Sequence, residues 1–293
     1  MAGPPITADA FAAAVLRVGR YRASPVVVKL GGSAMEDPAA TEACLRSVAV
    51  LNRLGVPLAL VHGGGKPIDR AMAEAGLTPK KVAGRRYTDD ATLAIVVRVL
   101  REINLDLVRR LDELGAEAAS FVKPDHHPLL GEVLQLRGPD GPIDLGWVGR
   151  VASLHDTDTL GWRVGECGEV PVIPSLAAYP DSPTGWLNVN ADTAAAAVAG
   201  ALQADRVIFL TDTPGVLRDR RDPHSLILKL TERKCRDLIA AGVIDGGMVP
   251  KVEACFEALE AGAKAALILD GRVPYSLLDV FLRDTIAGTE ITR

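Results

Sequence analysis

The sequence predicts an α/β fold with a largely parallel sheet. Short runs of β-branched residues alternate with long helical stretches along the 293 residues, which is the pattern of repeated βα units. Two of these runs, at 25–30 and 56–61, end in glycine-rich turns that precede a helix. Aromatic residues make up only 4% of the chain, so we expect a core built mainly from Ala, Val, Leu and Ile. The length allows one two-lobed domain or two domains.

The expected elements follow one another in a regular order. Buried strands are expected at 25–30, 56–61, 170–173, 206–210 and 265–269. A first helix is expected from Pro38 to about Gly55, and a second follows the glycines 63–65 and runs to about Gly76. Further helices are expected from about Asp89 to Gly115 and at 191–202, 231–241 and 249–261. Asp37 is suited to cap the first helix, because Pro38 after it fits the first turn.

Two segments depart from this alternation. The stretch 131–151 has two β-rich runs around the turn-rich 138–142, which predicts a β-hairpin. Ahead of the first strand, Phe11, Val15 and Val18 fall at helical spacing. A helix with one apolar stripe needs a partner surface, which is either its own subunit or the matching helix of another subunit.

Composition narrows the class of protein. A net charge of −4 argues against nucleic acid as the main partner. The four cysteines are scattered without C-x-x-C spacing, which favours reduced thiols over a metal or disulfide framework. No apolar run approaches the ~20 residues that span a membrane, and no secretory signal pattern opens the chain. We therefore expect a cytoplasmic protein with no membrane partner and no metal site.

Two lysines near opposite ends of the chain stand beside paired glycines. Lys29 precedes the pair 31–32, and Lys251 follows the pair 246–247. Glycines let backbone N–H groups approach a phosphate closely, while lysine supplies a compact charge. The glycines 63–65 end the next strand, at the edge where parallel sheets bind ligands. These turns predict an anion site, although G-x-G-x-x-G and P-loop fingerprints are absent.

The segment 188–193 opens an Ala-rich helix and allows two interpretations. Capping accounts for Asn190 as the N-cap and for Asp192 in the first turn. Capping does not account for Asn188, which is a candidate ligand donor. Asp192 is also a candidate acceptor for a lysine ammonium group.

Three further segments also leave two interpretations open. The Pro-Gly turn at 210–217 is either a plain turn or part of a nucleotide cradle. Arg85 and Arg86, in a short connection, are either solvent-exposed or a bidentate clamp for a carboxylate. His126 and His127 resemble metal ligands, but adjacent loop histidines beside a proline are more often surface residues.

The motifs together resemble one family, acetylglutamate kinase of the amino-acid kinase superfamily, over about residues 25 to 290. The resemblance lies in Val-Lys-Leu-Gly-Gly-Ser at 28–33, Val-His-Gly-Gly-Gly at 61–65, Gly-Arg-Arg-Tyr-Thr-Asp at 84–89, Asn-Val-Asn-Ala-Asp-Thr at 188–193, Leu-Thr-Asp-Thr-Pro-Gly-Val-Leu at 210–217 and Gly-Gly-Met-Val-Pro-Lys-Val at 246–252. The resemblance implies a three-layer αβα sandwich with a mainly parallel central sheet. It also implies ATP-dependent phosphorylation of the γ-carboxylate of N-acetyl-L-glutamate, the second step of arginine biosynthesis.

The resemblance further assigns parts of the chain. It implies an N-terminal helix at 1–24 that can join subunits, an acetylglutamate-binding and dimerising lobe at 25–189, and an ATP-binding lobe at 190–293. The residues that match catalytic positions are Lys29, Lys251 and Asp192. Those that match substrate-binding positions are Gly64, Gly65, Arg86, Asn188 and Asn190. The expected ATP contacts are Gly31, Gly32, Thr211, Asp212, Gly215, Leu217, Gly246, Gly247 and Met248, with Mg²⁺ held mainly through the ATP phosphates.

The resemblance also suggests how the activity of the protein is regulated. The N-terminal helix resembles that of arginine-inhibited members, which form hexamers, and 286–289 resembles their Gly-x-Gly-Thr loop with Ala287 in place of one glycine. Feedback by L-arginine, a homo-oligomer and a PII-type regulatory partner are therefore hypotheses. The rival activities are other kinases of the superfamily, acting on aspartate, glutamate, carbamate or carrier-linked aminoadipate, and a non-catalytic sensor with the same fold.

Overall fold

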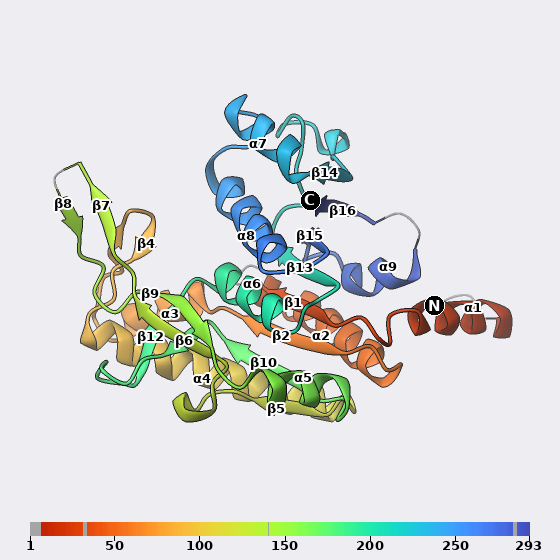
Figure 1. Ribbon diagram of the computed structural model, residues 1–293, viewed down its shortest axis with the longest axis horizontal. Coiled ribbons are helices and arrows are strands. Elements are labelled where there is room, and N and C mark those ends of the chain that lie inside the picture. Colours follow the sequence, from red (N-terminus) through yellow and green to blue (C-terminus); the bar gives the residue numbers. More distant parts are fainter. Residues whose placement is uncertain (1–6, 32–33, 140, 284–285) are drawn as a thin grey trace.

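An eight-stranded sheet runs through the whole molecule (Figure 1). The computed structural model describes residues 7–31, 34–139, 141–283 and 286–293. The strands, from one edge to the other, are β14 (Lys229–Thr231), β16 (Gly288–Thr292), β15 (Ala265–Asp270), β13 (Arg206–Thr211), β1 (Val26–Leu30), β2 (Leu58–His62), β10 (Val170–Pro174) and β5 (Ala118–Ser120). Every neighbouring pair is parallel except β15 and β16. The expected parallel sheet is confirmed.

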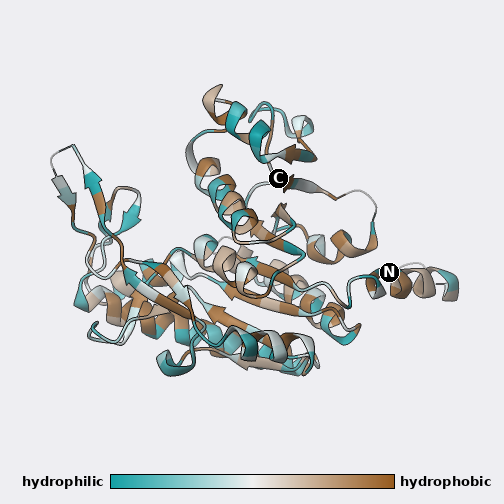
Figure 2. Cartoon of the chain, viewed as in Figure 1, coloured by the Kyte–Doolittle hydropathy of each residue, from teal (hydrophilic) through white to brown (hydrophobic). Residues whose placement is uncertain are grey.

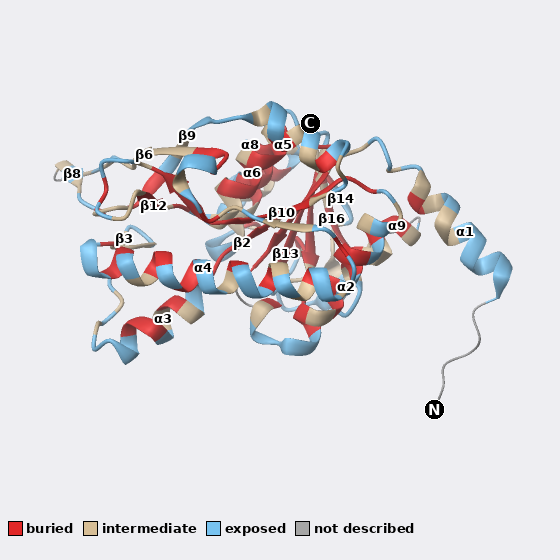
Figure 3. Ribbon diagram, turned by 90° about the horizontal axis from the view of Figure 1, so that it is seen from below, coloured by how far each residue is buried: buried red, intermediate tan, exposed pale blue. Residues whose placement is uncertain are grey.

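Helices cover both faces of this sheet and make three layers. One face packs on α2 (Pro38–Arg53), α4 (Asp90–Glu113) and α9 (Ser276–Leu282), and the other on α5 (Thr157–Gly165), α6 (Ala191–Ala201) and α8 (Val249–Glu260). The central strands are buried and apolar, while the outer sides of the helices are exposed and more polar (Figures 2 and 3). The αβα sandwich is therefore confirmed.

The alternation of side chains in β1 fixes where Lys29 lies. Val26, Val28 and Leu30 pack with the α2 layer, and Val27 packs with the α6 layer. Successive side chains of a strand point to opposite faces, so Lys29 lies on the face of Val27, toward α6. Lys29 pairs in register with Phe209 of β13 and Val61 of β2, which places it at the centre of the sheet.

The remaining elements lie around this sandwich. They are α1 (Ala8–Gly19), α3 (Gly65–Glu74), α7 (Glu232–Ala240), and the short 3₁₀ turns η1 (Ala34–Glu36), η2 (Pro124–His126), η3 (Pro223–Ser225) and η4 (Gly246–Met248). A second sheet has the order β12 (Trp186–Asn188), β11 (Leu176–Ala178), β6 (Leu129–Val133) and β9 (Gly149–Leu154). Two small ribbons pair β3 (Lys81–Val82) with β4 (Arg85–Arg86), and β7 (Leu136–Gly138) with β8 (Gly141–Ile143).

The hairpin expected at 131–151 is present with a more complex ladder. β6 pairs antiparallel with β9 at its base, and β7 pairs with β8 at its tip, which projects from the body of the molecule (Figure 1). The connection expected at Arg85 and Arg86 is instead a two-residue strand. Its partner β3 is too short to give a strand pattern in the sequence.

The N-terminal helix is present as α1, capped by Thr7, and it extends beyond the sandwich (Figure 3). Val18 is buried against the core, whereas Phe11 is 63% exposed and Leu16 is 74% exposed. Part of its apolar surface therefore has no cover from the residues that the structure describes. Among the described residues, no helix is both long and apolar enough to cross a membrane.

Candidate active site

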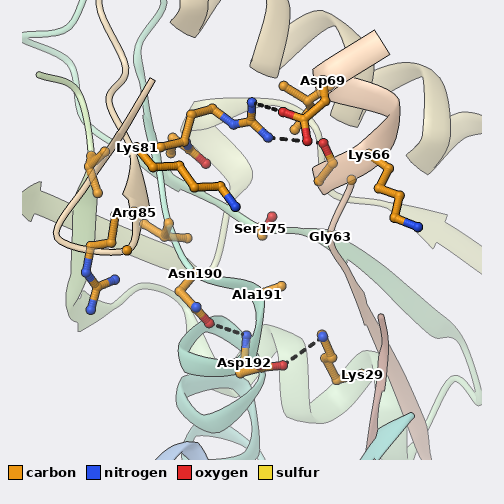
Figure 4. Close-up of a pocket in the computed structure, with 18 residues that line it drawn as sticks. Lys29, Gly63, Lys66, Asp69, Lys81, Arg85, Ser175, Asn190, Ala191 and Asp192 are labelled. Carbon is orange, nitrogen blue, oxygen red and sulfur yellow. Dashed lines mark hydrogen bonds and ion pairs between the residues drawn. The ribbon is translucent and has the colours of Figure 1, made fainter. Parts of the chain in front are cut away.

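A cavity of about 400 Å³ opens where β1, β2 and β12 end and where α3 and α6 begin (Figure 4). Its lining combines glycines with polar and charged side chains from segments far apart in the chain. The lining residues are Lys29, Gly63, Gly64, Gly65, Lys66, Ile68, Asp69, Lys81, Gly84, Arg85, Arg86, Val148, Ser175, Asn188, Val189, Asn190, Ala191 and Asp192. All five residues expected to bind the substrate, and two of the three expected catalytic residues, thus share one cavity.

Lys29 and Asp192 form an ion pair at the floor of this cavity. Nζ of Lys29 lies 2.7 Å from Oδ1 of Asp192, and the two side chains are 9% and 15% exposed. Oδ1 is buried and, within the described part of the chain, accepts no hydrogen bond of regular geometry, so the ammonium charge is what compensates it. The pair is held rigidly because Lys29 lies in the central strand and Asp192 lies in the first turn of α6.

Asn190 explains why α6 starts at this point. Its side-chain oxygen accepts hydrogen bonds from the backbone N–H groups of Asp192 and Thr193, at 2.7 and 3.2 Å. The capping interpretation is therefore confirmed, and it directs the positive end of the α6 dipole toward the cavity. Asn188, at the end of β12, donates from Nδ2 to Oγ1 of Thr88 at 3.1 Å. That bond orients the Asn188 amide beside the cavity.

Arg86 is held in place by Asp69, which the sequence did not single out, and by the backbone of Gly65. Nη1 donates to Oδ1 of Asp69 on α3 at 2.5 Å, and Nη2 donates to the carbonyl oxygen of Gly65 at 3.0 Å. The Arg86 side chain is 14% exposed. A guanidinium fixed on two sides presents its remaining N–H groups in one direction, which suits a carboxylate ligand.

Two lysine side chains beside Arg86 point in different directions relative to the cavity. Figure 4 shows Lys81 extending into the cavity, whereas Lys66 points away from it. Lys66 instead forms an ion pair with Glu36 of η1, the turn that follows the glycine pair 31–32. Lys66 and Glu36 therefore tie the end of that loop to the start of α3.

Gly31 is required by close packing at the end of β1. A Cβ atom at this position would lie 2.6 Å from the carbonyl oxygen of Leu210 and 3.2 Å from Nζ of Lys29. Only glycine lets the backbone pass this close to β13 and to the ammonium group. Gly32 lies outside the described residues.

A second cavity, of about 520 Å³, lies between the loop that follows β13 and the start of α8. Its lining contains Asp212, Gly215, Leu217, Gly247, Met248 and Lys251 from the expected ATP contacts and catalytic residues, together with Thr213, Pro214, Val216, Arg220, Val243 and Ile244. Thr211 is buried beneath it, with Oγ1 3.1 Å from the carbonyl oxygen of Thr213. Gly246, the residue before the cavity-lining Gly247 in η4, has a positive φ of 49°.

Lys251 is thus brought to the second cavity and not to the first. No ion pair joins it to Asp192 in the described ranges, although both residues act electrostatically on the buried thiol of Cys255. Burial first, and then the charge of Asp192, raise the pKa of that thiol, while Lys251 lowers it. Cys255 is therefore close enough to both charged residues to feel their charges.

The prediction that His126 and His127 are both surface residues is wrong for His127. His126 is exposed, but His127 is fully buried, with its ring nitrogens 2.9 and 2.8 Å from the carbonyl oxygens of Phe121 and Leu176. Its ring also meets Trp186 edge to face. His127 therefore ties the loop after β5 to β11, next to the cavity residue Ser175.

The chain belongs to the amino acid kinase family, because the model of that family matches residues 24–270. Curated relatives narrow the class to acetylglutamate kinases. The acetylglutamate kinase of Acaryochloris marina is 40% identical over 91% of this chain and 91% of its own length. That of Synechococcus sp. strain RCC307 is 41% identical over 94% of this chain and 90% of its own length.

A solved structure supports the same fold. The N-acetylglutamate synthase of Neisseria gonorrhoeae, complexed with coenzyme A and N-acetyl-glutamate, superposes with a TM-score of 0.78 over 97% of this chain and 63% of its own. Its sequence is 23% identical to this one, so the likeness bears on the fold alone.

Proposed function

We propose that this chain is an acetylglutamate kinase, which transfers the γ-phosphoryl group of ATP to the γ-carboxylate of N-acetyl-L-glutamate in arginine biosynthesis. The observation that carries the proposal is the cavity in which Lys29, Asp192, Arg86, Asn188 and the glycines 63–65 meet. The two curated relatives, matched over nine-tenths of the chain, are acetylglutamate kinases.

Arg86 and Asn188 are the proposed anchors of the substrate. The α-carboxylate pairs with the Arg86 guanidinium, which Asp69 and the Gly65 carbonyl hold in a fixed direction. The acetylamino group lies near Asn188, whose amide is oriented by Thr88. The γ-carboxylate then extends toward Gly64, Gly65 and Lys29, where backbone N–H groups and the ammonium can bind its oxygens.

The chemistry of the acceptor fits the side chains of this cavity. A carboxylate is already ionised at pH 7, so the attack needs no general base. Phosphoryl transfer instead needs in-line placement and stabilisation of the charge on the moving group. Lys29 supplies charge from one side, and the N-terminus of α6 adds its dipole beside it.

ATP is the proposed ligand of the second cavity. Its residues come from the loop after β13 and from the start of α8, where Gly247 offers a backbone N–H group and Lys251 a charge. Mg²⁺ prefers oxygen ligands with several waters, so we expect it to enter with the ATP phosphates. Transfer then needs Lys251 and the phosphates to approach Lys29, which we assign to closure of the two lobes, 25–189 and 190–293.

A hydroxamate assay tests the function. The protein is incubated with MgATP, hydroxylamine and one acceptor at a time: acetylglutamate, glutamate or aspartate. We expect the acyl phosphate of acetylglutamate to be trapped as hydroxamate, and the free amino acids to give little product. Preference for glutamate or aspartate would make the chain a different kinase of the family, and no ATP consumption with any acceptor would favour a sensor.

Regulation and assembly are proposed on narrower grounds. The exposed Phe11 and Leu16 on α1 fit an exchange of helices between subunits, which gives a hexamer built from dimers. Feedback inhibition by L-arginine and binding of a PII-type regulatory protein are proposed together with the hexamer. The proposed location of the protein is the cytoplasm. Light scattering that gives a dimer would contradict the hexamer, and kinetics unchanged by millimolar L-arginine would contradict the feedback.

A further inference from the structure

A buried chain of hydrogen bonds lies directly beneath the glycines 63–65. His62, the last residue of β2, and Asn104, in the middle of α4, are both 0% exposed. Nδ1 of His62 lies 3.1 Å from the carbonyl oxygen of Gly63, and Nε2 lies 3.0 Å from Nδ2 of Asn104. Oγ of Ser120 on β5 donates to Oδ1 of Asn104 at 2.7 Å.

The partners decide where each proton lies. Nδ2 of Asn104 lies 2.8 Å from the carbonyl oxygen of Val172, which can only accept, so this end of the amide is the NH₂ group. Its second N–H then donates to Nε2 of His62, which must carry no proton. Nδ1 must carry the ring proton instead, because it faces the carbonyl oxygen of Gly63. Every polar side-chain atom of His62 and Asn104 thereby has a hydrogen-bond partner, and no donor faces another donor.

The ring is also kept neutral. Burial lowers the pKa of His62 to about 4, and the bond to Gly63 opposes this only in part. At neutral pH the imidazole therefore has one fixed tautomer and acts as a rigid donor. It is not a proton acceptor for the reaction.

The direction of one carbonyl matters for the cavity. In a planar trans peptide the C=O and N–H groups point to opposite sides. A Gly63 carbonyl held toward His62 therefore turns the N–H of Gly64 away from the buried ring. Gly64 lines the substrate cavity, and its N–H has no hydrogen-bond partner within the described ranges of the chain.

Helix α4, which carries Asn104, also packs closely against Gly64. A Cβ atom on Gly64 would lie 2.9 Å from Cδ2 of Leu100 and 3.0 Å from Cδ1 of Ile103. Leu100, Ile103 and Asn104 lie on one face of α4, since they are three and four residues apart. One turn of α4 thus contacts Gly64 through packing and Gly63 through the His62 ring.

We propose that His62 and Asn104 are positioning residues for phosphoryl transfer, which hold the Gly63 carbonyl toward the core and so direct the Gly64 amide at the bound carboxylate. The inference rests on the proposed function of this cavity. Neither side chain lines the cavity, so both act through the glycine backbone.

The first test is the tautomer of His62 in the wild-type protein. Nitrogen-15 NMR of histidine-labelled protein distinguishes the two neutral tautomers, and the missing signal of His62→Gln assigns the resonance. We expect a neutral ring protonated on Nδ1 at pH 7. A ring protonated on Nε2, or a charged ring, would overturn the inference whether or not the protein is an active kinase.

The second test compares two substitutions of similar size. The amide nitrogen of His62→Asn can replace Nδ1 and donate to the carbonyl oxygen of Gly63. The amide oxygen of His62→Gln can instead replace Nε2 and accept from Asn104, which leaves the Gly63 carbonyl without its donor. We expect the KM for acetylglutamate to rise about tenfold in His62→Gln and to stay within about threefold of wild type in His62→Asn, with the KM for ATP unchanged in both.

This comparison separates positioning from folding. A loss of folded protein lowers the active fraction and hence kcat, but it does not raise the KM for one substrate alone. Equal KM values for acetylglutamate in the two variants would overturn the inference. If neither variant folds, the tautomer of His62 in the wild-type protein decides whether the inference holds. A wild-type protein that is inactive with acetylglutamate would contradict the proposed function and not the position of the ring proton.

Discussion

Replacing Gly64 and Gly65 one at a time should change the stability of the protein differently, although the glycines are adjacent. In Gly64→Ala the new methyl group would lie 2.9 Å from Cδ2 of Leu100 and 3.0 Å from Cδ1 of Ile103, closer than carbon atoms pack. The φ of Gly64 is −167°, which any residue can adopt, so the penalty comes from packing and not from the backbone. Overpacking of this kind costs about 1–2 kcal/mol in unfolding free energy.

Gly65→Ala is the matched control. Nothing lies within 4 Å of a Cβ atom at Gly65, which begins α3, and alanine is favoured over glycine in a helix by up to about 1 kcal/mol. We therefore expect its stability to equal or exceed that of wild type. Gly65 also lines the cavity that we propose for acetylglutamate, and a methyl group added there would occupy open space, so we expect the KM for acetylglutamate to rise in this variant as well.

Urea unfolding followed by circular dichroism measures both stabilities, and the two KM values come from an ADP-release assay. The expected pattern is a lower midpoint for Gly64→Ala alone and a weaker substrate affinity for both variants. Equal losses of stability in the two variants would refute the packing of α4 against Gly64. Unchanged KM values in both would refute the glycines as the substrate site.

Three further outcomes are expected. Lys29→Met should lower kcat by about a hundredfold or more, the scale of losing one preorganised donor, and near-normal turnover would exclude Lys29 from the transfer step. Lys251→Ala should lower kcat by a similar factor while the KM for acetylglutamate stays the same, since Lys251 lines the other cavity. Because the pKa of His62 is lowered to about 4, the unfolded chain binds more protons below pH 6.5, and the unfolding free energy should fall by up to about 3 kcal/mol between pH 6.5 and 4. His62→Gln should have a shallower pH dependence of stability, and an identical slope would contradict the buried neutral ring.

The sequence was sufficient for elements whose signals are local. β1 and α2 were predicted within a few residues, because an apolar run ends in glycine and because Asp37 caps a helix with Pro38 at its first turn. Most strands of the two large sheets that were not predicted are short: β5, β11, β12 and β14 have three residues each, and only the edge-proximal β16 has five. Strands this short show no period of their own and exist because a neighbouring strand pairs with them.

The site shows the same division. The glycine turns, the two lysines and Asn190 carry local signals, and the structure gathers most of them at two cavities. Asp69, which orients Arg86, carries no such signal, because an aspartate in an amphipathic helix reads as a solvent-facing residue. Its role depends on the packing of α3 beside β4, which sequence spacing does not show.

His127 is the clearest failure of local reasoning. His126 and His127 are adjacent and identical in type, yet one is exposed and the other has both ring nitrogens against buried carbonyl oxygens. His62 and Asn104 are 42 residues apart, so their bond could not be anticipated from the sequence either. In both cases the buried partners are backbone or side-chain atoms supplied by the tertiary fold.

The central claim, that a carboxylate of acetylglutamate accepts the phosphoryl group between Gly64 and Lys29, is tested most directly with oxygen-18. Acetylglutamate labelled in its γ-carboxylate is incubated with unlabelled MgATP and hydroxylamine, which attacks the carbonyl carbon of the acyl phosphate and releases the bridging oxygen on phosphate. Phosphorus-31 NMR of the released phosphate should then show one oxygen-18 per molecule. Phosphate without oxygen-18 would mean that ATP is hydrolysed without transfer to the carboxylate, and it would contradict the claim.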